Sequence, residues 1–200
     1  MIREIRPAIV LILAMTLITG LAYPLAITGL AGVIFPYQAH GSLLARDGNI
    51  IGSTLIGQAF TDAKYFHGRP SATTAPDPAD SSKSVPAPYN AGNSAGSNLA
   101  PSAKTLADRI KTDSAALAEE NPGVPIPVDL VTTSASGLDP DITPAAALFQ
   151  VPRIAKARGL EEGRLRVLIE EKTQGRILGI FGEPRVNVLE INLALDALKR

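Results

Sequence analysis

The hydrophobic residues of this chain are concentrated near its N-terminus. From Pro7 through Ala45 there is no Asp, Glu, Lys or Arg. Within that span, residues 8–30 (AIVLILAMTLITGLAYPLAITGL) would form a helix about 34 Å long at ~1.5 Å per residue, enough to cross a hydrocarbon core about 30 Å thick. The pattern predicts one transmembrane helix over residues 8–30, with an extension to about residue 36 left open. Pro7 is expected in its first turn.

Two helix-perturbing residues, Gly20 and Pro24, lie inside this predicted helix. Such residues are tolerated in membrane helices when neighbouring helices satisfy the backbone groups that they free. We therefore interpret Gly20 and Pro24 as candidate contacts with a helical partner. The alternative is a cleaved signal peptide with Arg3 and Arg6 in its basic region. It is disfavoured because the apolar run exceeds the roughly 7–15 residues of a signal core and no A-x-A cleavage site follows.

The charges that flank the helix predict its orientation. Arg3 and Arg6 precede it, whereas only Arg46 lies within the counted distance after it. Because cytoplasmic flanks are enriched in Lys and Arg, residues 1–7 are expected in the cytoplasm and residues 37–200 in the periplasm. The absence of cysteine fits an exported domain without disulfides, and it equally fits a cytoplasmic one.

The pattern after the helix predicts a hairpin and then a long polar segment. Two short apolar runs flank Asp47-Gly48 within residues 41–57, and Asp-Gly between such runs is a strong hairpin signal. Residues 71–102 are dominated by Ala, Pro, Ser, Gly, Asn and Thr, with too few apolar side chains to offset backbone entropy. We interpret them as a surface loop or disordered insertion, or else as a long loop that becomes ordered on a partner protein.

The remaining pattern predicts short helices and strands. An amphipathic helix is expected over residues 102–120, a strand over 128–132, a second helix over 160–172 and a short buried strand over 177–181. The last segment, 186–198, fits either a helix or a strand. The predicted fold class is therefore α+β: a single N-terminal transmembrane helix followed by one extracytoplasmic mixed α/β domain with a long polar loop.

Local capping patterns add detail to these helices. Asn187 followed by Glu190 three residues later resembles a capping box, which favours a helix for the last segment. Thr143 before Pro144 is an N-cap followed by proline at the first helical position. Pro152 removes one intrahelical hydrogen bond and should kink or split the helix that follows.

Composition and motifs argue against several kinds of chemistry. Lys and Arg number 19 and so do Asp and Glu, without a basic cluster, so nucleic acid is not an expected partner. His40 and His67 fall in different loops and there is no cysteine, so no metal site is expected. Ser136-Gly137 lacks the strand–G-x-S-x-G–helix context, and no phosphate-cradling glycine motif occurs. A membrane-tethered hydrolase using Ser136 and an aspartate is kept as a remote rival.

Six segments of the chain together form a recognisable series. They are GSTLIGQAF (52–60), YFHGRPSAT (65–73), YNAGNSAGSNLAPS (89–102), VDLVTTSASGLDPDITPAAA (128–147), QVPRIAKARGL (150–160) and GEPRVNVLEINLALD (182–196). In this order, after one N-terminal span, they resemble the C subunit of the Kdp potassium-transporting P-type ATPase of bacteria. The resemblance covers essentially the whole chain. Ala95 departs from it, because the family usually has glycine there.

The resemblance implies a non-catalytic accessory subunit of an ATP-driven, high-affinity potassium uptake complex in the bacterial inner membrane. Its implied partners are a channel-like potassium-binding subunit, a P-type ATPase subunit and a small single-span subunit. One implied role is assembly together with a catalytic chaperone action that supports ATP binding by the ATPase subunit. The alternative is a structural lid over the outer mouth of the channel-like subunit. No firmly bound cofactor is implied, and ATP would be reached through the ATPase subunit.

The resemblance also points to particular residues. A nucleotide-linked segment likened to an ATP-binding-cassette signature would fall on Ser136, Gly137 and Gln150, although the expected topology separates it from cytoplasmic ATP. Docking on the channel-like subunit would use the polar loops 68–71 and 89–98. The candidate contact residues in these loops are Arg69, Tyr89, Asn90, Ser97 and Asn98. Arg69 would pair with a partner carboxylate or remain an exposed turn residue.

Overall fold

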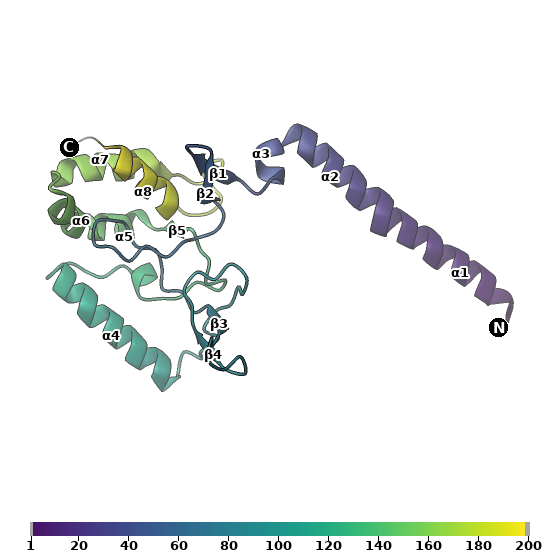
Figure 1. The fold of residues 1–200 in the computed structure, drawn as a ribbon, viewed down its shortest axis with the longest axis horizontal. Coiled ribbons are helices and arrows are strands. Elements are labelled where there is room, and N and C mark those ends of the chain that lie inside the picture. The colour runs from purple at the N-terminus through teal and green to yellow at the C-terminus, as the bar shows by residue number, and fades with distance from the viewer. Residues whose placement is uncertain (1, 199–200) are drawn as a thin grey trace. The chain divides into compact units, whose positions relative to one another are not determined.

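The computed structural model describes residues 2–198 and divides into two compact units, 1–53 and 54–200 (Figure 1). The first unit begins with one continuous helical rod made of α1 (Ile2–Leu17), a π-helical turn η1 (Ile18–Ala22) and α2 (Tyr23–Ile34). Its Arg3–Ile34 portion is long and apolar enough to cross a membrane.

The helix starts earlier than the apolar pattern predicts. We expected Pro7 in the first turn, but α1 begins at Ile2 and Pro7 lies inside it. The reason is that Arg and Glu, which precede the proline, are good helix formers, so their charge does not end the helix. Pro7 then removes one hydrogen bond close to the helix N-terminus, where few bonds are lost.

The π-helical turn coincides with the two residues singled out in the sequence. Proline lacks an N–H and its ring clashes with the carbonyl four residues earlier, which for Pro24 is that of Gly20. The structure accommodates this with a wider turn, in which the Tyr23 N–H donates to the carbonyl of Ile18, five residues back. Inserted π turns of this kind are frequent at functional sites. The contact of Gly20 and Pro24 with a partner helix stays a prediction.

The first unit ends in a short helix and a hairpin. Helix α3 (Pro36–Ala39) precedes the antiparallel strands β1 (Leu43–Arg46) and β2 (Asn49–Ser53). Between the strands, Asp47 and Gly48 have φ values of 52° and 80°, as a type I′ turn requires. The hairpin predicted from Asp-Gly is confirmed.

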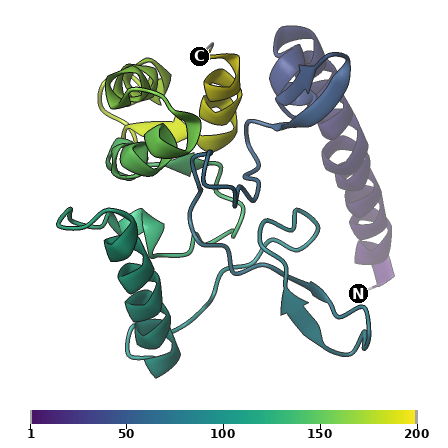
Figure 2. The same ribbon diagram turned by 60° about the vertical axis from the view of Figure 1, so that its left-hand side comes forward.

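Four helices and a small sheet form the centre of the second unit (Figures 1 and 2). The helices are α5 (Pro144–Phe149), α6 (Val151–Arg158), α7 (Glu162–Lys172) and α8 (Val188–Ala197). The sheet has the antiparallel order β5-β7-β6, with β5 at Asp141–Ile142, β7 at Arg185–Asn187 and β6 at Thr173–Gln174. The mixed α+β class is thereby confirmed, together with one N-terminal helix of membrane-spanning length.

Two capping predictions hold in detail. The Thr143 hydroxyl accepts from the Ala146 N–H at 3.1 Å and Pro144 opens α5, as expected. The Asn187 side chain accepts from the Glu190 N–H at 3.1 Å, so the ambiguous last segment is a helix, α8. The proline expected to split the α5 region, Pro152, lies in the first turn of α6, two residues after the break at Gln150.

Two strand predictions are wrong. Residues 128–132 begin with a 3₁₀ turn, η2 (Val128–Leu130), because the Thr132 hydroxyl bonds back to the Val128 carbonyl at 2.8 Å and prolines precede the segment. Residues 177–181 form an exposed turn with one isolated bridge between Ile177 and Phe181 rather than a buried strand. Apolar composition alone does not decide whether a short run is buried.

The polar segment 71–102 is not the disordered insertion that its composition suggested. It contains a second hairpin, β3 (Thr74–Pro76) with β4 (Ser84–Pro86), and it leads into the amphipathic helix α4 (Lys104–Glu120), which is confirmed. In both views α4 stands apart from the cluster of α5–α8 (Figures 1 and 2). Hydrogen bonds rather than apolar burial define the segment, as described below.

Residues 60–70 cross the core as an extended segment without regular strand structure. Phe66 is its most buried residue, with no exposed side-chain surface, and it packs against the apolar faces of the surrounding helices. The side chain of Asn192 on α8 accepts from the Phe66 N–H at 2.8 Å and donates to the Phe66 carbonyl at 2.9 Å. A buried amide therefore satisfies the backbone here as a neighbouring strand would.

Candidate functional site

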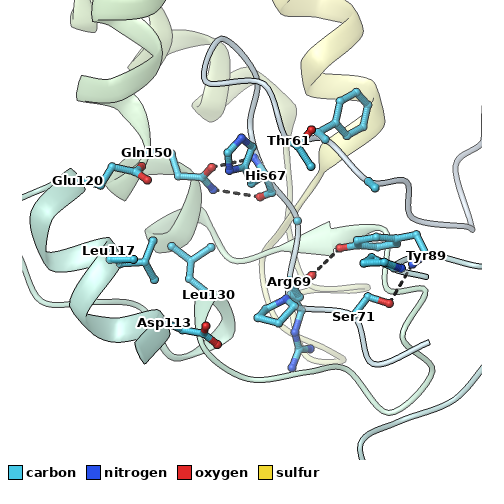
Figure 3. A pocket seen from close by; sticks show the side chains of 16 residues that line it. Thr61, His67, Arg69, Ser71, Tyr89, Asp113, Leu117, Glu120, Leu130 and Gln150 are labelled. Atoms are coloured by element: carbon cyan, nitrogen blue, oxygen red, sulfur yellow. Dashed lines mark hydrogen bonds between the residues drawn. The ribbon is translucent and has the colours of Figure 1, made fainter. Parts of the chain in front are cut away.

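A second buried amide continues the same arrangement one residue further. Gln150, only 2% exposed, accepts from the His67 N–H at 2.8 Å and donates to the His67 carbonyl at 3.1 Å (Figure 3). Its amide also donates to the Ala146 carbonyl, and its oxygen accepts from Arg153. Every polar atom of the Gln150 side chain is thus committed to holding the fold, which explains the residue without nucleotide contact.

The surroundings of His67 favour the neutral form of its imidazole. Burial lowers the pKa of the His67 imidazole, and the nearby Arg153 guanidinium lowers it further. One ring nitrogen, Nε2, lies 3.1 Å from the Asp62 carbonyl. The other histidine, His40, has its Nδ1 2.7 Å from the Pro36 carbonyl. Both histidines therefore contact backbone rather than Ser136, and the arrangement gives no support to a serine hydrolase.

The segment that follows His67 organises the polar loops around one hydroxyl. Ser71 Oγ donates to the Gly137 carbonyl at 2.7 Å and accepts from the Tyr89 N–H at 3.0 Å. Thr73, which is almost fully buried, donates to the Ala87 carbonyl at 2.6 Å. Three distant stretches of chain are therefore tied together by short hydroxyl side chains.

Asparagine side chains extend this network into the β3–β4 hairpin. Asn90 donates through Nδ2 to the Thr74 carbonyl at 2.7 Å, and its own N–H donates to Thr73 Oγ1. Asn93 donates to the same Thr74 carbonyl at 3.0 Å. Asn90 thus fixes the base of the loop that carries the remaining candidate contact residues.

Arg69 finds its carboxylate within the chain. Its Nη1 lies 2.9 Å from Asp139 Oδ2, and its other nitrogens donate to the carbonyls of Thr132 and Thr133 at 3.4–3.5 Å. The side chain is about a quarter exposed. The pairing expected with a partner's carboxylate is therefore made with Asp139, so Arg69 joins loop 68–71 to residues 132–139.

Residues 94–98 pack on the same 132–139 stretch. The carbonyl of Ser136 accepts from the Ala95 N–H at 2.9 Å and from the Ser94 hydroxyl at 3.0 Å, while Ser97 Oγ lies 3.4 Å from the Thr133 hydroxyl. The approach is so close that a Cβ on Gly96 would lie 2.8 Å from the Ala135 carbonyl oxygen. Alanine at position 95, where the family usually has glycine, fits this arrangement because the Ala95 N–H, and not its side chain, makes the contact with Ser136.

Ser136 and Gly137 are structural in this arrangement. Ser136 Oγ accepts from the Leu138 N–H at 3.1 Å, closing a local turn. Gly137 has φ 68°, and a Cβ there would collide with Thr73 and with the Ala95 carbonyl. Gln150 instead bonds to the backbone of His67, so Ser136 and Gly137 on one side and Gln150 on the other have separate roles in the fold.

The structure therefore unites most of the predicted contact residues on one surface. We call it the docking face after the partner contacts that the sequence predicts there, which stay a prediction, and it consists of loop 68–71, loop 89–98 and residues 132–139. It includes Arg69, Tyr89, Asn90, Ser97 and Asn98, and the last of these is exposed with a left-handed φ of 51°. Gly20 and Pro24 belong to the other unit and are considered separately.

Sequence reasoning missed the residues that hold this face in place. Ser71, Thr73 and Asn192 carry the key hydrogen bonds; all three lie in segments that carry the resemblance, yet no local pattern indicated their bonding partners. One signal was available for Asn192, because it interrupts the apolar residues of α8 that face the core. A polar side chain on the buried side of an amphipathic helix generally has a specific partner.

A cleft of about 490 Å³ opens between α4 and the central segment (Figure 3). Leu117 and Leu130 contribute apolar walls, and Asp113 and Glu120 of α4 contribute carboxylates. Glu120 pairs with Arg153 at 2.7 Å and Asp113 with Arg109 at 3.4 Å. Over residues 2–198 no group of three His, Cys, Asp or Glu is placed to hold a metal ion. The cleft offers neither a metal ligand set nor a nucleophile–base pair.

These features define a class: a protein with one helix of membrane-spanning length and a mixed α/β domain that presents ordered polar loops. The chain matches the family model described as K⁺-transporting ATPase, c chain, over residues 5–197. The chain belongs to that family, and the resemblance seen in the sequence is confirmed.

Relatives of similar length match the chain throughout. A protein of Rhodopseudomonas palustris strain BisB18 is 71% identical over 199 residues, covering 100% of both chains. One from Methylobacterium nodulans is 67% identical over 198 residues, covering 99% of this chain and 98% of the relative. One from Methylorubrum populi is 66% identical over 200 residues, covering 100% of both. Each of these relatives is named a potassium-transporting ATPase KdpC subunit.

Tyr89 allows a direct test of the docking face. Its hydroxyl donates to the Arg69 carbonyl at 2.7 Å, and burial, followed by the Asp139 charge, raises the pKa of Tyr89 to about 12. The folded state therefore favours the protonated phenol, whose contribution to stability is complete below the ordinary pKa of about 10 and is lost as the pH rises from 10 toward 12.

We expect Tyr89→Phe to lower the melting temperature of the full chain in detergent by about 2–4 °C at pH 8, since one hydrogen bond contributes ~1 kcal/mol. The difference between the two proteins should shrink toward zero by pH 12. Thermal unfolding followed by circular dichroism at both pH values measures it. A difference that stays constant across this range would show that the Tyr89 hydroxyl does not make the bond.

Proposed function

We propose that the chain is the non-catalytic accessory subunit of an ATP-driven potassium uptake complex in a bacterial inner membrane. Its family membership supports the subunit role, since relatives across their full length are named as subunits of a potassium-transporting ATPase. Its partners would be a channel-like potassium-binding subunit, a P-type ATPase subunit and a small single-span subunit. The residues of the candidate site have roles in the fold, which fits a subunit that supplies no catalytic group.

The docking face carries the functional part of this proposal. Its loops are long and polar, but Ser71, Arg69 and Tyr89 fix them from beneath through bonds of 2.7–3.0 Å. Loops that are ordered before binding lose little entropy when a partner docks, which increases affinity. The face therefore supports a structural role at the outer mouth of the channel-like subunit, where the chain would stabilise the assembled complex.

The effect on ATP would be indirect. Ser136, Gly137 and Gln150 make intramolecular contacts that leave them little capacity to bind nucleotide. A catalytic chaperone action then requires coupling between the docked domain and the ATPase subunit, transmitted through packed helices. The π-helical turn at Gly20 and Pro24 is a natural place for such packing, because neighbouring helices can satisfy backbone groups that the turn frees.

The orientation of the chain follows from its flanking charges. Arg3 and Arg6 precede the span and Arg46 follows it, which supports the proposal that the large domain lies outside the cytoplasm. We expect protease added to sealed right-side-out vesicles to digest the domain, and protease on inside-out vesicles to leave it intact. Immunoblotting with an antibody to the C-terminal region reads the result. Digestion only in inside-out vesicles would reverse the topology and reopen direct contact with ATP.

Asn98 offers a test of docking that spares the fold. Its side chain is exposed, and aspartate tolerates the same left-handed backbone. We expect Asn98→Asp to weaken association with the channel-like subunit about 10-fold, which corresponds to roughly 1.4 kcal/mol. The reason is that docking would remove the new carboxylate from water. Co-purification from membranes in increasing detergent, with potassium-stimulated ATP hydrolysis, measures the loss.

Two controls accompany this experiment. Asn98→Gly keeps the backbone conformation and adds no charge, so it should associate more tightly than Asn98→Asp. Lys111→Gln makes the same change of net charge on an exposed position of α4 and should associate normally. If Asn98→Asp assembled as well as Lys111→Gln while both remained folded, the docking face would not be the interface.

A further inference from the structure

Residues Ile177–Phe181 form an exposed apolar tip on the loop between β6 and β7. Ile177, Leu178, Ile180 and Phe181 are between 61% and 84% exposed, with Leu178 the highest. No other stretch of five residues in the described part of the second unit exposes four large hydrophobic side chains. Contiguous exposed apolar surface of this kind on a soluble domain generally marks an interaction site.

The apolar tip is an ordered turn. The N–H groups of Ile177 and Phe181 each donate to the carbonyl of the other at 2.9 and 3.0 Å, and the Ile180 N–H donates to the Ile177 carbonyl at 3.1 Å. Below the turn, Arg176 pairs with Glu183 at 2.6 Å. These bonds order the tip in the chain alone, before it binds a membrane or a partner.

Leu178 is unfavourable for folding in two respects. Its φ is 54°, a left-handed conformation that is unfavourable for leucine, and its side chain gains no burial in compensation. Asparagine or glycine would suit this position better if the turn served only to reverse the chain. A strained and exposed hydrophobic residue is instead expected where the side chain has a use outside the fold.

We propose that the apolar tip inserts into the surface of the lipid bilayer that the chain's own N-terminal helix crosses. Its side chains are aliphatic or phenyl, with no polar group from Ile177 to Phe181. Most of its N–H groups are satisfied within the turn, as an apolar solvent requires. Protein interfaces, in contrast, rely at their centres on Trp, Tyr and Arg, and leucine is under-represented there.

Charge and tethering also suit a lipid surface. Two arginines flank the tip and are partly exposed, Arg176 paired with Glu183 at 2.6 Å and Arg185 with Asp141 at 3.0 Å, so guanidinium groups lie at its base where phospholipid headgroups would be. The second unit joins the membrane-spanning helix through residues 35–53, whose fully extended length is at most about 65 Å. The domain thus stays near the bilayer, which raises the local concentration of the tip at its surface.

A single tryptophan can report insertion, because the chain contains none. Phe181→Trp is introduced into the full chain, which is reconstituted without other subunits in vesicles of phosphatidylethanolamine and phosphatidylglycerol. Lipids brominated along their acyl chains serve as the quencher. Val128→Trp, at another exposed position of the same unit, is the matched control. We expect blue-shifted emission and strong quenching for Phe181→Trp, and solvent-like emission with little quenching for Val128→Trp.

A second substitution separates insertion from folding. Leu178→Asn, added to Phe181→Trp, relieves the left-handed strain but removes a large apolar side chain. The melting temperature should be unchanged or higher, while the equilibrium for insertion falls by about 10-fold or more, which is the effect of burying one leucine.

The outcomes decide the proposal. Insertion is supported if bromolipids quench the tryptophan of the Phe181→Trp protein and if adding Leu178→Asn abolishes that quenching. Equal quenching of the Phe181→Trp and Val128→Trp proteins overturns it. A blue shift without bromolipid quenching, seen only after the ATPase and channel-like subunits are added, would assign the tip to a protein surface and overturn it as well.

Discussion

Two buried side-chain amides hold the second unit together at its centre. Asn192 and Gln150 each bond to both the N–H and the carbonyl of one residue, Phe66 and His67, which have no neighbouring strand. Without these amides, the two backbone groups of Phe66 would be buried and unpaired, at roughly 1–3 kcal/mol each, and those of His67 would be unpaired and partly buried. Residues 60–70 can cross the core only because α8 and the α5–α6 junction supply side-chain amides that bond to this backbone as a neighbouring strand would.

The docking face depends on this constraint. Once His67 is fixed, the chain continues directly into Arg69 and Ser71, which bond to residues 132–139 and to the Tyr89 region. The order of the polar loops thus comes from the core and not from their own composition. A segment rich in Ser, Gly and Asn therefore has a defined surface, and in the proposed function this order reduces the entropy lost on binding a partner subunit.

Local chemistry made part of the fold predictable. The Asp47-Gly48 hairpin and the helices capped by Thr143 and Asn187 follow from a few adjacent residues, and the structure confirms them. The run at 177–181 was misassigned because its apolar composition fits burial and exposure equally.

The candidate site was only partly predictable for a related reason. The resemblance to a family located the loops, but Arg69 meets Asp139 across 70 positions, and Gln150 meets His67 across 83. Neither pairing has a local signal. Side-chain bonds over such separations arise from the assembled core, and a single sequence does not specify them.

Amide hydrogen exchange of the full chain in detergent, resolved at single residues, tests the role of the two buried side-chain amides. We expect the backbone amides of Phe66 and His67 to exchange as slowly as those of the buried face of α8, although they lie outside helices and strands, because slow exchange requires opening of the core. Exchange of both amides at the rate of the exposed Ala79 loop would contradict it.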